Sequence, residues 1–519
     1  MKNKILFSFL TYIFLSCGGS KMPVDLVIIN GQVIDGTGDV AQNMDVVINA
    51  DSIVEVATSA SMKYKASRVI DAEGMVVSPG FIDPHTHASS DLNDSTNNAN
   101  LNYLMQGVTT VFVGNDGRGA LNLEEQFNLW RTQGIGTNAA SFIGHSTVRL
   151  AAMGMNDDVP SEQELENMKT MVQRAMEAGG LGLSSGLYYA PSSYATTDEV
   201  IELAKVAASY GGVYDVHMRD EGSYAKGVIA SITETIQIAE EANIHGHIAH
   251  IKCLGADVWG KSTEAIKVIE EAQQRGISIT ADQYPYRASG TSILGALIPR
   301  WILSYDGDPR DQLSDRSIVR RLKSDMKESL RIRGGAESIL LTAPNKFNAD
   351  LKGKTLAEAS VTLGLDPIDA AIAIWENGGS AVGSYNMKEE DMINFMSEEW
   401  VMTGSDGSLG HPRKYGSYSK KIKEYVLDKE VLSLERMIHQ STSLPAKTFG
   451  LSRRGELIGG NYADIIVFDP AEVKDNATFE EPTALSEGMA FVLVNGQLTI
   501  ENGEYNQSLA GRALRPKRE

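Results

Sequence analysis

Four histidines of this sequence stand where they could bind one metal ion. His85 and His87 follow a short apolar run and are separated by a single residue. Side chains alternate between the two faces of a β-strand, so these two imidazoles would point to the same side. His217 and His250 follow two other apolar runs. Imidazole nitrogen is a common zinc ligand, and a catalytic zinc keeps one position for water. The pattern therefore predicts a catalytic metal centre.

An aspartate late in the chain could complete the chemistry of such a centre. A bound divalent ion lowers the pKa of its water toward neutrality and polarises a carbonyl group, so an amide bond can be attacked without a protein nucleophile. Asp406 can take the proton of that water and later deliver it to the leaving amine. Ser185 and Ser405 lack the Gly-x-Ser-x-Gly pattern of a nucleophilic serine, and Cys253 has no recognisable base partner. We therefore predict metal-dependent hydrolysis.

These residues need a scaffold that brings distant parts of the chain together, and the middle of the sequence predicts one. Short apolar runs alternate with amphipathic stretches at 162–178, 198–210, 225–243 and 262–275, which favours βα units and a parallel sheet. Eight strands close a (β/α)8 TIM-like barrel, whose C-terminal strand ends meet at one mouth. The predicted strands are 76–83, 109–113, 139–143, 181–184, 213–216, 247–249, 278–281 and 400–403. The polar residues that follow them are His85 and His87, Asp116, His145, Ser185, His217, His250, Asp282 with Tyr284, and Asp406.

The two ends of the chain predict a second, smaller domain. Residues 22–78 show short Val- and Ile-rich alternation, and the same style returns in 455–519. Asn30-Gly31 and Asn495-Gly496 are hairpin signals because both residue types tolerate positive φ. We expect a small β-sandwich built from both ends, and the hydrolase barrel in 79–454. Within the barrel region, the long segment 288–333 either folds over the mouth as a lid that excludes water or forms a solvated helical hairpin.

The first residues have the pattern of an export signal. Lys2 and Lys4 precede an apolar run over 5–15, too short to span a bilayer as a mature helix but suited to a signal peptide over 1–16. Cys17 and the Gly-Gly-Ser after it resemble the lipid attachment site of bacterial lipoproteins; the alternative is an ordinary signal peptide with an incidental cysteine. Only one other cysteine would remain, so no internal disulfide can form. We expect an exported, periplasmic or cell-envelope lipoprotein that meets the membrane through its lipid anchor only.

Composition excludes one class of partner. The chain of 519 residues is 42% hydrophobic, which suffices for a large core. Its formal net charge of -20 would repel the phosphate backbone of a nucleic acid, which needs clustered Lys and Arg to displace its counterions. We expect a small-molecule substrate and no nucleic acid.

An ordered set of short motifs runs over nearly the whole chain. The motifs are Gly80-Phe-Ile-Asp-Pro-His-Thr-His87, Gly107-Val-Thr-Thr110, Gly144-His145 with Arg149, Gly186-Leu-Tyr-Tyr-Ala-Pro191, His217-Met-Arg-Asp-Glu221, His250-Ile-Lys252, Asp282-Gln-Tyr-Pro-Tyr286, Gly404-Ser-Asp-Gly407, His411-Pro-Arg413 and Ala463-Asp464. Together they resemble the D-aminoacylase, or N-acyl-D-amino-acid deacylase, group of the amidohydrolase superfamily. The resemblance implies hydrolysis of N-acyl-D-amino acids, or of dipeptides with a C-terminal D-residue, with one or two Zn²⁺ ions.

The resemblance also implies roles for individual residues. His217 and His250 would hold the tightly bound zinc, with His85 and His87 at an adjoining metal position and Asp406 as catalytic acid and base. Arg413 would clamp the free carboxylate of the substrate, because guanidinium presents a planar pair of donors. The other residues implied to line the substrate pocket are Lys252, Tyr284 and Tyr189.

The sequence departs from this group at one metal position. Gly114-Asn115 is followed by Asp116, where the group usually has cysteine. A carboxylate can still bind or bridge zinc, but it is a harder ligand than thiolate, so metal preference and metal number stay open.

Other functions are compatible with parts of the pattern. A cyclic amidase or dipeptidase resembling dihydroorotases would commonly bridge two metals with a carboxylated lysine, and the predicted fourth strand ends Gly182-Leu-Ser-Ser-Gly186 without one. A non-catalytic peptide-binding lipoprotein would share the signal sequence and the acidic charge. It would have no need of histidines at several strand ends. The sequence leaves open the preferred side chain and acyl group.

Overall fold

The computed structural model describes residues 21–305 and 307–516. The predicted signal peptide over 1–16 and the lipid attachment site at Cys17 lie outside these residues. Among the helices of the described ranges, none is long and apolar enough to cross a bilayer.

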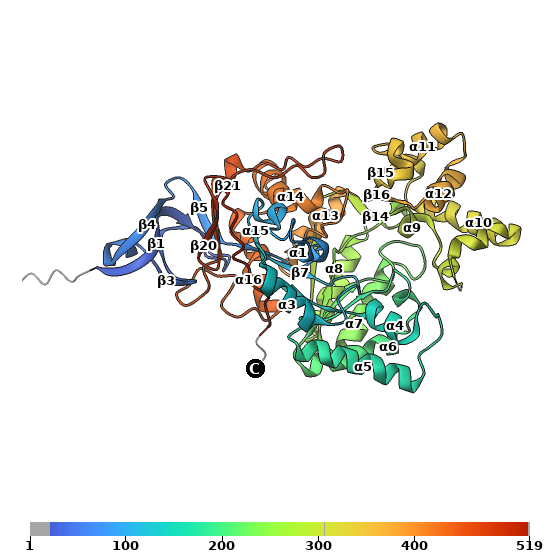
Figure 1. The fold of residues 1–519 in the computed structure, drawn as a ribbon, viewed down its shortest axis with the longest axis horizontal. Coiled ribbons are helices and arrows are strands. Elements are labelled where there is room, and N and C mark those ends of the chain that lie inside the picture. Colours follow the sequence, from blue (N-terminus) through green and yellow to red (C-terminus); the bar gives the residue numbers. More distant parts are fainter. Residues whose placement is uncertain (1–20, 306, 517–519) are drawn as a thin grey trace, which may run out of the picture.

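The centre of the molecule is the predicted (β/α)8 barrel (Figure 1). Hydrogen bonds pair two runs of parallel strands, β6-β7-β8 and β9-β10-β11-β12-β13-β17. β8 and β9 are two parts of one strand, interrupted at Phe142, and a parallel bridge between Thr86 and Gly407 joins the ends of β6 and β17. The ring described by these ranges therefore has eight strand positions. They are β6 (Phe81–Asp83), β7 (Val108–Val113), β8 (Asn138–Ser141) with β9 (Ile143–Gly144), β10 (Gly182–Gly186), β11 (Val213–His217), β12 (His245–Ile248), β13 (Ile279–Gln283) and β17 (Val401–Thr403).

The helices around the ring follow the amphipathic stretches of the sequence. α5 (Glu162–Glu177) begins at a capping box, in which Ser161 and Glu164 satisfy each other's backbone N–H groups. The next three are α6 (Thr197–Ser209), α7 (Val228–Ala242) and α8 (Ser262–Gln274). Their ends differ from the predicted ranges by no more than three residues. One predicted strand, 76–83, is divided at Gly80: β5 (Val76–Pro79) belongs to the small domain and β6 to the barrel.

Both chain ends form the predicted small β domain, at the left of Figure 1. In the described residues its strands make one connected sheet, in the order β21-β20-β19-β18-β5-β1-β2-β3, with β4 paired to β1. Its aliphatic core includes Ile28, Val46 and Ile465. The strands are β1 (Met22–Val33), β2 (Gln42–Asn49), β3 (Ser52–Ala57), β4 (Tyr64–Asp71), β5, β18 (Ile465–Phe468), β19 (Met489–Val494), β20 (Gln497–Glu501) and β21 (Glu504–Tyr505).

One of the two predicted hairpins is wrong. Asn495-Gly496 does connect β19 to β20, but Asn30-Gly31 lies inside β1, where the register against β2 shifts. Asn30 has a φ of 61°, which produces a bulge rather than a chain reversal. Beyond this point β1 changes partner from β4 to β5. The bulge therefore marks the point in β1 where its pairing passes from β4 to β5.

The segment predicted as a lid is the first part of a larger insertion, residues 288–385, at the upper right of Figure 1. It has its own buried core, which includes Ile302, Leu322 and Ile374, so it is neither a simple helical hairpin nor limited to residue 333. Its sheet has the order β14-β16-β15. The elements are β14 (Ala288–Ser292), α9 (Ile293–Leu297), α10 (Arg316–Ile332), β15 (Ile339–Pro344), α11 (Leu356–Leu363), α12 (Pro367–Glu376) and β16 (Ser380–Tyr385), with short 3-10 turns between them.

Candidate metal centre and active site

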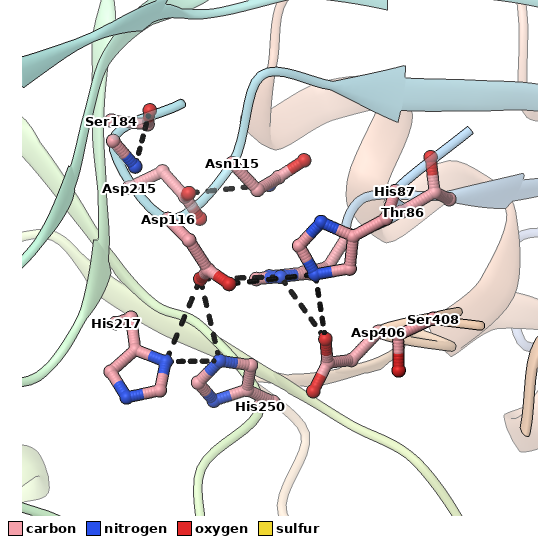
Figure 2. A network of polar contacts seen from close by, with 12 residues as sticks. Thr86, His87, Asn115, Asp116, Ser184, Asp215, His217, His250, Asp406 and Ser408 are labelled. Carbon is pink, nitrogen blue, oxygen red and sulfur yellow. Dashed lines mark hydrogen bonds and ion pairs between the residues drawn. The ribbon is translucent and has the colours of Figure 1, made fainter. Parts of the chain in front are cut away.

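Asp116 occupies the centre of the predicted metal site, among the imidazoles of four histidines (Figure 2). Its Oδ1 lies 3.5 Å from His85 Nε2, 3.6 Å from His217 Nδ1 and 3.5 Å from His250 Nε2. Its Oδ2 lies 3.5 Å from His87 Nε2. One carboxylate therefore faces the His217 and His250 pair with one oxygen and His87 with the other. We call these five residues the histidine cluster.

The histidine cluster fits zinc. Donor atoms from His85, Asp116, His250 and Asp406 all lie within 4.8 Å of one another. Ligands around a tetrahedral zinc at the usual bond lengths are separated by about 3.3 Å. The distances between His217 Nδ1 and His250 Nε2, 2.9 Å, and between His85 Nε2 and Asp406 Oδ1, 3.7 Å, bracket that value. His85 is fully buried and neither of its ring nitrogens has a hydrogen-bond partner among the described residues. Buried polar atoms are normally paired, so these orphans indicate a ligand.

Charge at the histidine cluster also suits a cation. Burial lowers the pKa of His85 to about 4, which keeps its imidazole neutral and able to bind metal. Burial acts to raise the pKa of the Asp116 carboxyl, but His85, His217 and His250 outweigh it and hold that pKa well below its usual range. Asp116 is therefore ionised.

Glu221 supports the cluster from behind, and sequence reasoning quoted it in a motif without giving it a role. Its Oε1 accepts a hydrogen bond from Lys252 Nζ at 2.6 Å and lies 3.0 Å from His250 Nδ1. Its Oε2 lies 3.8 Å from His217 Nε2. A carboxylate on the outer nitrogen of a ligating imidazole fixes ring orientation and tautomer. The spacing His217-x-x-x-Glu221 on one loop was the available signal.

Asp406 lies on the other side of the cluster, next to His87 (Figure 2), and has Arg413 as its second partner. Its Oδ1 is 3.1 Å from His87 Nε2, and its Oδ2 is 2.8 Å from Arg413 Nη1. Its backbone N–H donates to the carbonyl of His85 at 2.9 Å. Burial acts to raise the pKa of Asp406, but Arg413 and His250 outweigh it and hold that pKa far below its usual range. The carboxylate is therefore available as a base.

Three residues of the site have strained backbone. Asp116, His250 and Asp406 have φ values of 56°, 37° and 46°, a region that side chains other than glycine's rarely adopt. Each follows the end of a barrel strand. Such conformations cost about 1–3 kcal/mol each and persist only where the surrounding structure enforces them. The strand ends therefore turn sharply to aim these three side chains at one point.

A cavity of about 530 Å³ opens above the histidine cluster. Nine of the ten predicted site residues line it, and the tenth, His85, lies directly beneath. The Tyr284 hydroxyl and Arg413 Nε are buried without hydrogen-bond partners among the described residues. Arg413 also stacks on the Tyr284 ring, 4.5 Å from its centroid. Tyr189 packs against His217, with ring centroids 4.8 Å apart. The insertion completes the wall with Ser289, Gly290, Thr291, Ser292, Leu294, Gly295, Arg333 and Ala381.

Two residues expected at strand ends do not reach the site. Both ring nitrogens of His145 are occupied, by Ser192 Oγ at 2.8 Å and Glu199 Oε1 at 3.0 Å. Ser185 exchanges a hydrogen bond of 2.7 Å with Tyr214. Neither lines the cavity. β10 ends in Ser184 and Ser185 without a lysine that could be carboxylated, and Asp116 is the carboxylate that lies among the four histidines.

The sequence profile of the amidohydrolase family matches residues 68–277 and 395–500, which include every residue of the histidine cluster and Asp406. The chain belongs to the amidohydrolase family. The region without a match contains the insertion over 288–385.

Individual amidohydrolases resemble the chain over nearly its whole length. It is 30% identical to a D-aminoacylase of Alcaligenes xylosoxydans xylosoxydans, covering 95% of this chain and 98% of the relative. It is 32% identical to an N-acyl-D-glutamate deacylase of the same organism, covering 91% and 93%. A solved N-acyl-D-glutamate deacylase from Bordetella bronchiseptica, with zinc and a phosphonate mimic of the tetrahedral intermediate, superposes with a TM-score of 0.81 at 29% identity, covering 95% and 100%.

Proposed function

We propose that this protein is a metal-dependent hydrolase that removes the acyl group from N-acyl-D-amino acids or cleaves dipeptides with a C-terminal D-residue. One observation carries the proposal: the cavity joins a zinc-type donor set and an ionised Asp406 to buried, unpartnered donors on Tyr284 and Arg413. An N-acyl amino acid has both groups that such a cavity needs, an amide carbonyl and a free carboxylate. We infer the D-configuration of the substrate from the names of the relatives described above, a D-aminoacylase and an N-acyl-D-glutamate deacylase.

The amide would be cleaved by water with Asp406 moving the proton. Zinc held by the histidine cluster supplies Lewis acidity that polarises the carbonyl and makes water more acidic. Asp406 accepts a proton from the attacking water as a new C–O bond forms. It then returns this proton to the nitrogen as the C–N bond breaks, which releases the amine of the D-amino acid and the carboxylic acid. The ion pair with Arg413 has two effects on Asp406: it keeps the carboxylate ionised before attack, and it holds the side chain in place.

Substrate orientation would come from the cavity wall beside Asp406. Arg413 uses Nη1 on Asp406 and Nη2 on Ser408, which leaves Nε unpartnered. The Tyr284 hydroxyl is a second unpartnered donor, and Lys252 lies 5.6 Å from the Tyr284 ring. Charge-assisted bonds from a guanidinium to a carboxylate are among the strongest available to a protein. A carboxylate fixed at one end would place the amide carbonyl beside Asp406 and the histidine cluster, which line the same cavity.

The test is hydrolysis of paired enantiomers by zinc-loaded protein. We expect release of free amine from N-acetyl-D-leucine or N-acetyl-D-glutamate, loss of this activity on chelation, and its return when zinc is added. The L-enantiomers serve as matched controls. Equal rates for D and L substrates would overturn the D-selectivity, and unchanged rates after complete metal removal would overturn the mechanism.

We also propose that the protein is an exported lipoprotein anchored at Cys17. The support is the sequence pattern alone: two lysines, an apolar run over 5–15, and a cysteine followed by Gly-Gly-Ser. The variant Cys17→Ala in the full precursor tests it. We expect the wild-type protein to fractionate with membranes and to incorporate labelled fatty acid, and the variant to do neither. An unlabelled wild-type protein would contradict the anchor.

A further inference from the structure

A buried arginine in the cavity wall has no ion-pair partner. Arg333, at the end of α10, is 3% exposed and lines the active-site cavity. Its Nε donates to the carbonyl of Ala296 at 3.0 Å and its Nη1 to Ser384 Oγ at 3.2 Å. No carboxylate of the described residues pairs with it. Buried charges are normally matched by an opposite charge, because desolvating a lone ion is costly.

Of the four other Lys and Arg side chains that line the cavity, three have carboxylate partners, and the fourth, Arg118, is exposed to solvent. Lys252 pairs with Glu221 at 2.6 Å and Arg413 with Asp406 at 2.8 Å. Lys414 pairs with Asp91. A buried arginine without an ion pair is therefore an exception in this cavity, in a protein whose net charge of -20 reflects an excess of carboxylates.

Two further arginines, also without ion pairs among the described residues, lie near Arg333. Arg118 lies over the Tyr189 ring, 5.3 Å from its centroid, and Arg300 lies over the Tyr188 ring at 4.5 Å. Arg333 itself lies 5.5 Å from the centroid of Tyr224. The tyrosine rings contact one another: Tyr188 lies 5.1 Å from Tyr189 and 6.2 Å from Tyr224. We call the stretch of cavity wall formed by these three arginines and three tyrosines the arginine chamber. Arg333 and Arg118 line the active-site cavity, and Arg118, Arg300 and Tyr224 line a neighbouring one.

The arginine chamber spans the active-site cavity and a second cavity of about 370 Å³ beside α9 and α10 of the insertion; both cavities are lined by Arg118, Tyr188 and Tyr189. Asp325 and Glu328 also line the second cavity, and each pairs with another arginine of α10, Arg321 at 4.0 Å and Arg331 at 2.8 Å. Arg333, which has no such partner among the described residues, faces the active-site cavity. Tyr189 also contacts His217 of the histidine cluster. A group on a substrate held at the metal can therefore reach the chamber.

We infer that the arginine chamber binds a second carboxylate of the substrate, with Arg333 as the residue that determines this specificity. The inference rests on the proposed function and names its substrate class: N-acyl-D-amino acids with two negative charges. Guanidinium groups match carboxylates in shape and charge. The tyrosine rings keep water away from the arginines without neutralising their positive charge. The second carboxylate can belong to an acidic D-side chain or to a dicarboxylic acyl group.

Two pairs of nearly isosteric substrates distinguish these sources. Zinc-loaded protein is assayed with N-acetyl-D-glutamate against N-acetyl-D-glutamine, and with N-succinyl-D-alanine against its N-succinamoyl analogue. In each pair the second member has a neutral amide in place of the second carboxylate, and both members keep the α-carboxylate. We expect kcat/KM for the charged member to exceed that for the neutral member by about 30-fold or more in one pair, as for a charge-assisted bond made in a desolvated site. The pair that shows the preference identifies which part of the substrate enters the chamber. A ratio near one in both pairs overturns the inference.

The variant Arg333→Met tests the assigned residue. We expect the charged-to-neutral ratio to fall at least 30-fold in the preferred pair, mainly through KM, whereas Arg333→Lys should restore part of it. Arg320→Met is the matched control: Arg320 lies on α10, is exposed and lines neither cavity. It should leave the ratio and the rates unchanged. A purely architectural role for Arg333 would reduce folded protein but not the ratio.

A second variant keeps the test decisive if Arg333→Met does not fold. Arg118 is exposed, and its side chain makes no hydrogen bond or ion pair among the described residues, so Arg118→Gln should fold normally. It should lower the ratio by about fivefold, as for a partly solvated charge. Unchanged ratios in Arg118→Gln and in Arg333→Lys together overturn the inference.

Ligand binding separates failure of this inference from failure of the proposed function. D-glutamate against D-glutamine, and succinate against succinamate, are titrated into zinc-loaded protein by calorimetry. We expect tighter binding of the charged member of one pair, lost in Arg333→Met. If no amide is hydrolysed but this difference is present, the deacylase assignment fails and the chamber stands. If amides are hydrolysed without any such difference, the chamber fails alone.

Discussion

Two buried histidine and carboxylate groupings lie on the same barrel, and only one has atoms available for a ligand. In the histidine cluster, both nitrogens of His85 and Oδ1 of Asp116 lack hydrogen-bond partners in the described structure. We call the second grouping the His145 group. It is a series of contacts in which Ser192 bonds to His145, His145 to Glu199, and Glu199 to Arg149. Both nitrogens of His145 and both oxygens of Glu199 are occupied there.

The difference teaches that residue type and strand-end position do not by themselves make a site. The contacts from Ser192 to His145 to Glu199 follow the serine, histidine and carboxylate series of a serine-protease triad. These side chains are buried, however, and do not line the active-site cavity. The His145 group instead packs beside the loop that carries Asp116: Thr147 N donates to the carbonyl of Gly117. One grouping has unpartnered ligand atoms that suit a cation, whereas the other supports the loop that carries Asp116.

The largest effect should come from Asp406→Asn. The variant keeps the size of the side chain but cannot accept the proton, so kcat should fall by roughly 10³- to 10⁴-fold, the scale of general acid and base catalysis. The thermal midpoint should fall because Asp406 also pairs with the buried Arg413, and Asp406 is one of the grouped metal donors, so kcat is measured on folded, zinc-loaded protein. Steady-state kinetics with metal analysis checks this. A variant that keeps a tenth of the wild-type kcat would remove Asp406 from the chemistry.

Glu199→Gln should affect stability instead of chemistry. Removing one partner of a buried ion pair with Arg149 and His145 should destabilise the fold by about 3–5 kcal/mol. kcat of the folded fraction should stay within a few fold of wild type. Urea unfolding and active-site titration separate the two. A selective loss of kcat with normal stability would show that the two groupings are not distinct in role.

The cost of Glu199→Gln should also depend on pH. Burial acts to raise the pKa of Glu199, but His145 and Arg149 outweigh it and lower that pKa from its ordinary 4.5. The folded state therefore binds the proton more weakly than the unfolded state, so the stabilisation is present above about pH 4.5 and is lost as pH falls through the lowered pKa. The difference in unfolding free energy between wild type and variant should shrink in acid. A difference that grows toward low pH would contradict this sign.

The comparison also shows where sequence reasoning stops. The barrel strands and flanking helices were predictable because their apolar periods and capping residues are local signals, as at Ser161 and Glu164. Strand-end polar residues were predictable in the same way, but His145 and His217 give the same local signal. Their partners, Glu199 and Asp116, are distant in sequence, and only the folded structure shows which ring keeps an open nitrogen.

Misassigned features have equally physical reasons. Asn30-Gly31 was predicted as a turn because positive φ is shared by turns and bulges, and only the pairing of β1 with β4 and β5 distinguishes them. The insertion was predicted to end near residue 333 because β15 and β16 have ordinary composition. Arg333 drew no attention in the sequence, since an unpaired charge is defined by what is absent around it.

Glu221→Gln should give a smaller effect on function, through the histidine cluster. Loss of the negative charge behind His217 and His250 should weaken zinc binding by about 10- to 100-fold, the usual cost of losing the carboxylate on a ligating imidazole. Loss of the buried ion pair with Lys252 should also destabilise the fold, so zinc binding is measured on folded protein. Competition with a chromogenic chelator measures the affinity. Unaltered zinc affinity would place Glu221 with Lys252 as a substrate contact only.

Tyr284→Phe should give the smallest effect and the sharpest view of the substrate end. The Tyr284 hydroxyl is buried without a partner, so its removal costs the free protein little and costs the complex one hydrogen bond to a carboxylate. KM should rise by about tenfold, since a bond to a charged group contributes about 1.5 kcal/mol or somewhat more, while kcat changes much less because proton transfer by Asp406 does not involve this hydroxyl. The same substitution should have no effect on inhibition by an amide that lacks the free carboxylate. Equal weakening of acids and neutral amides would mean that Tyr284 shapes the cavity without reading the charge.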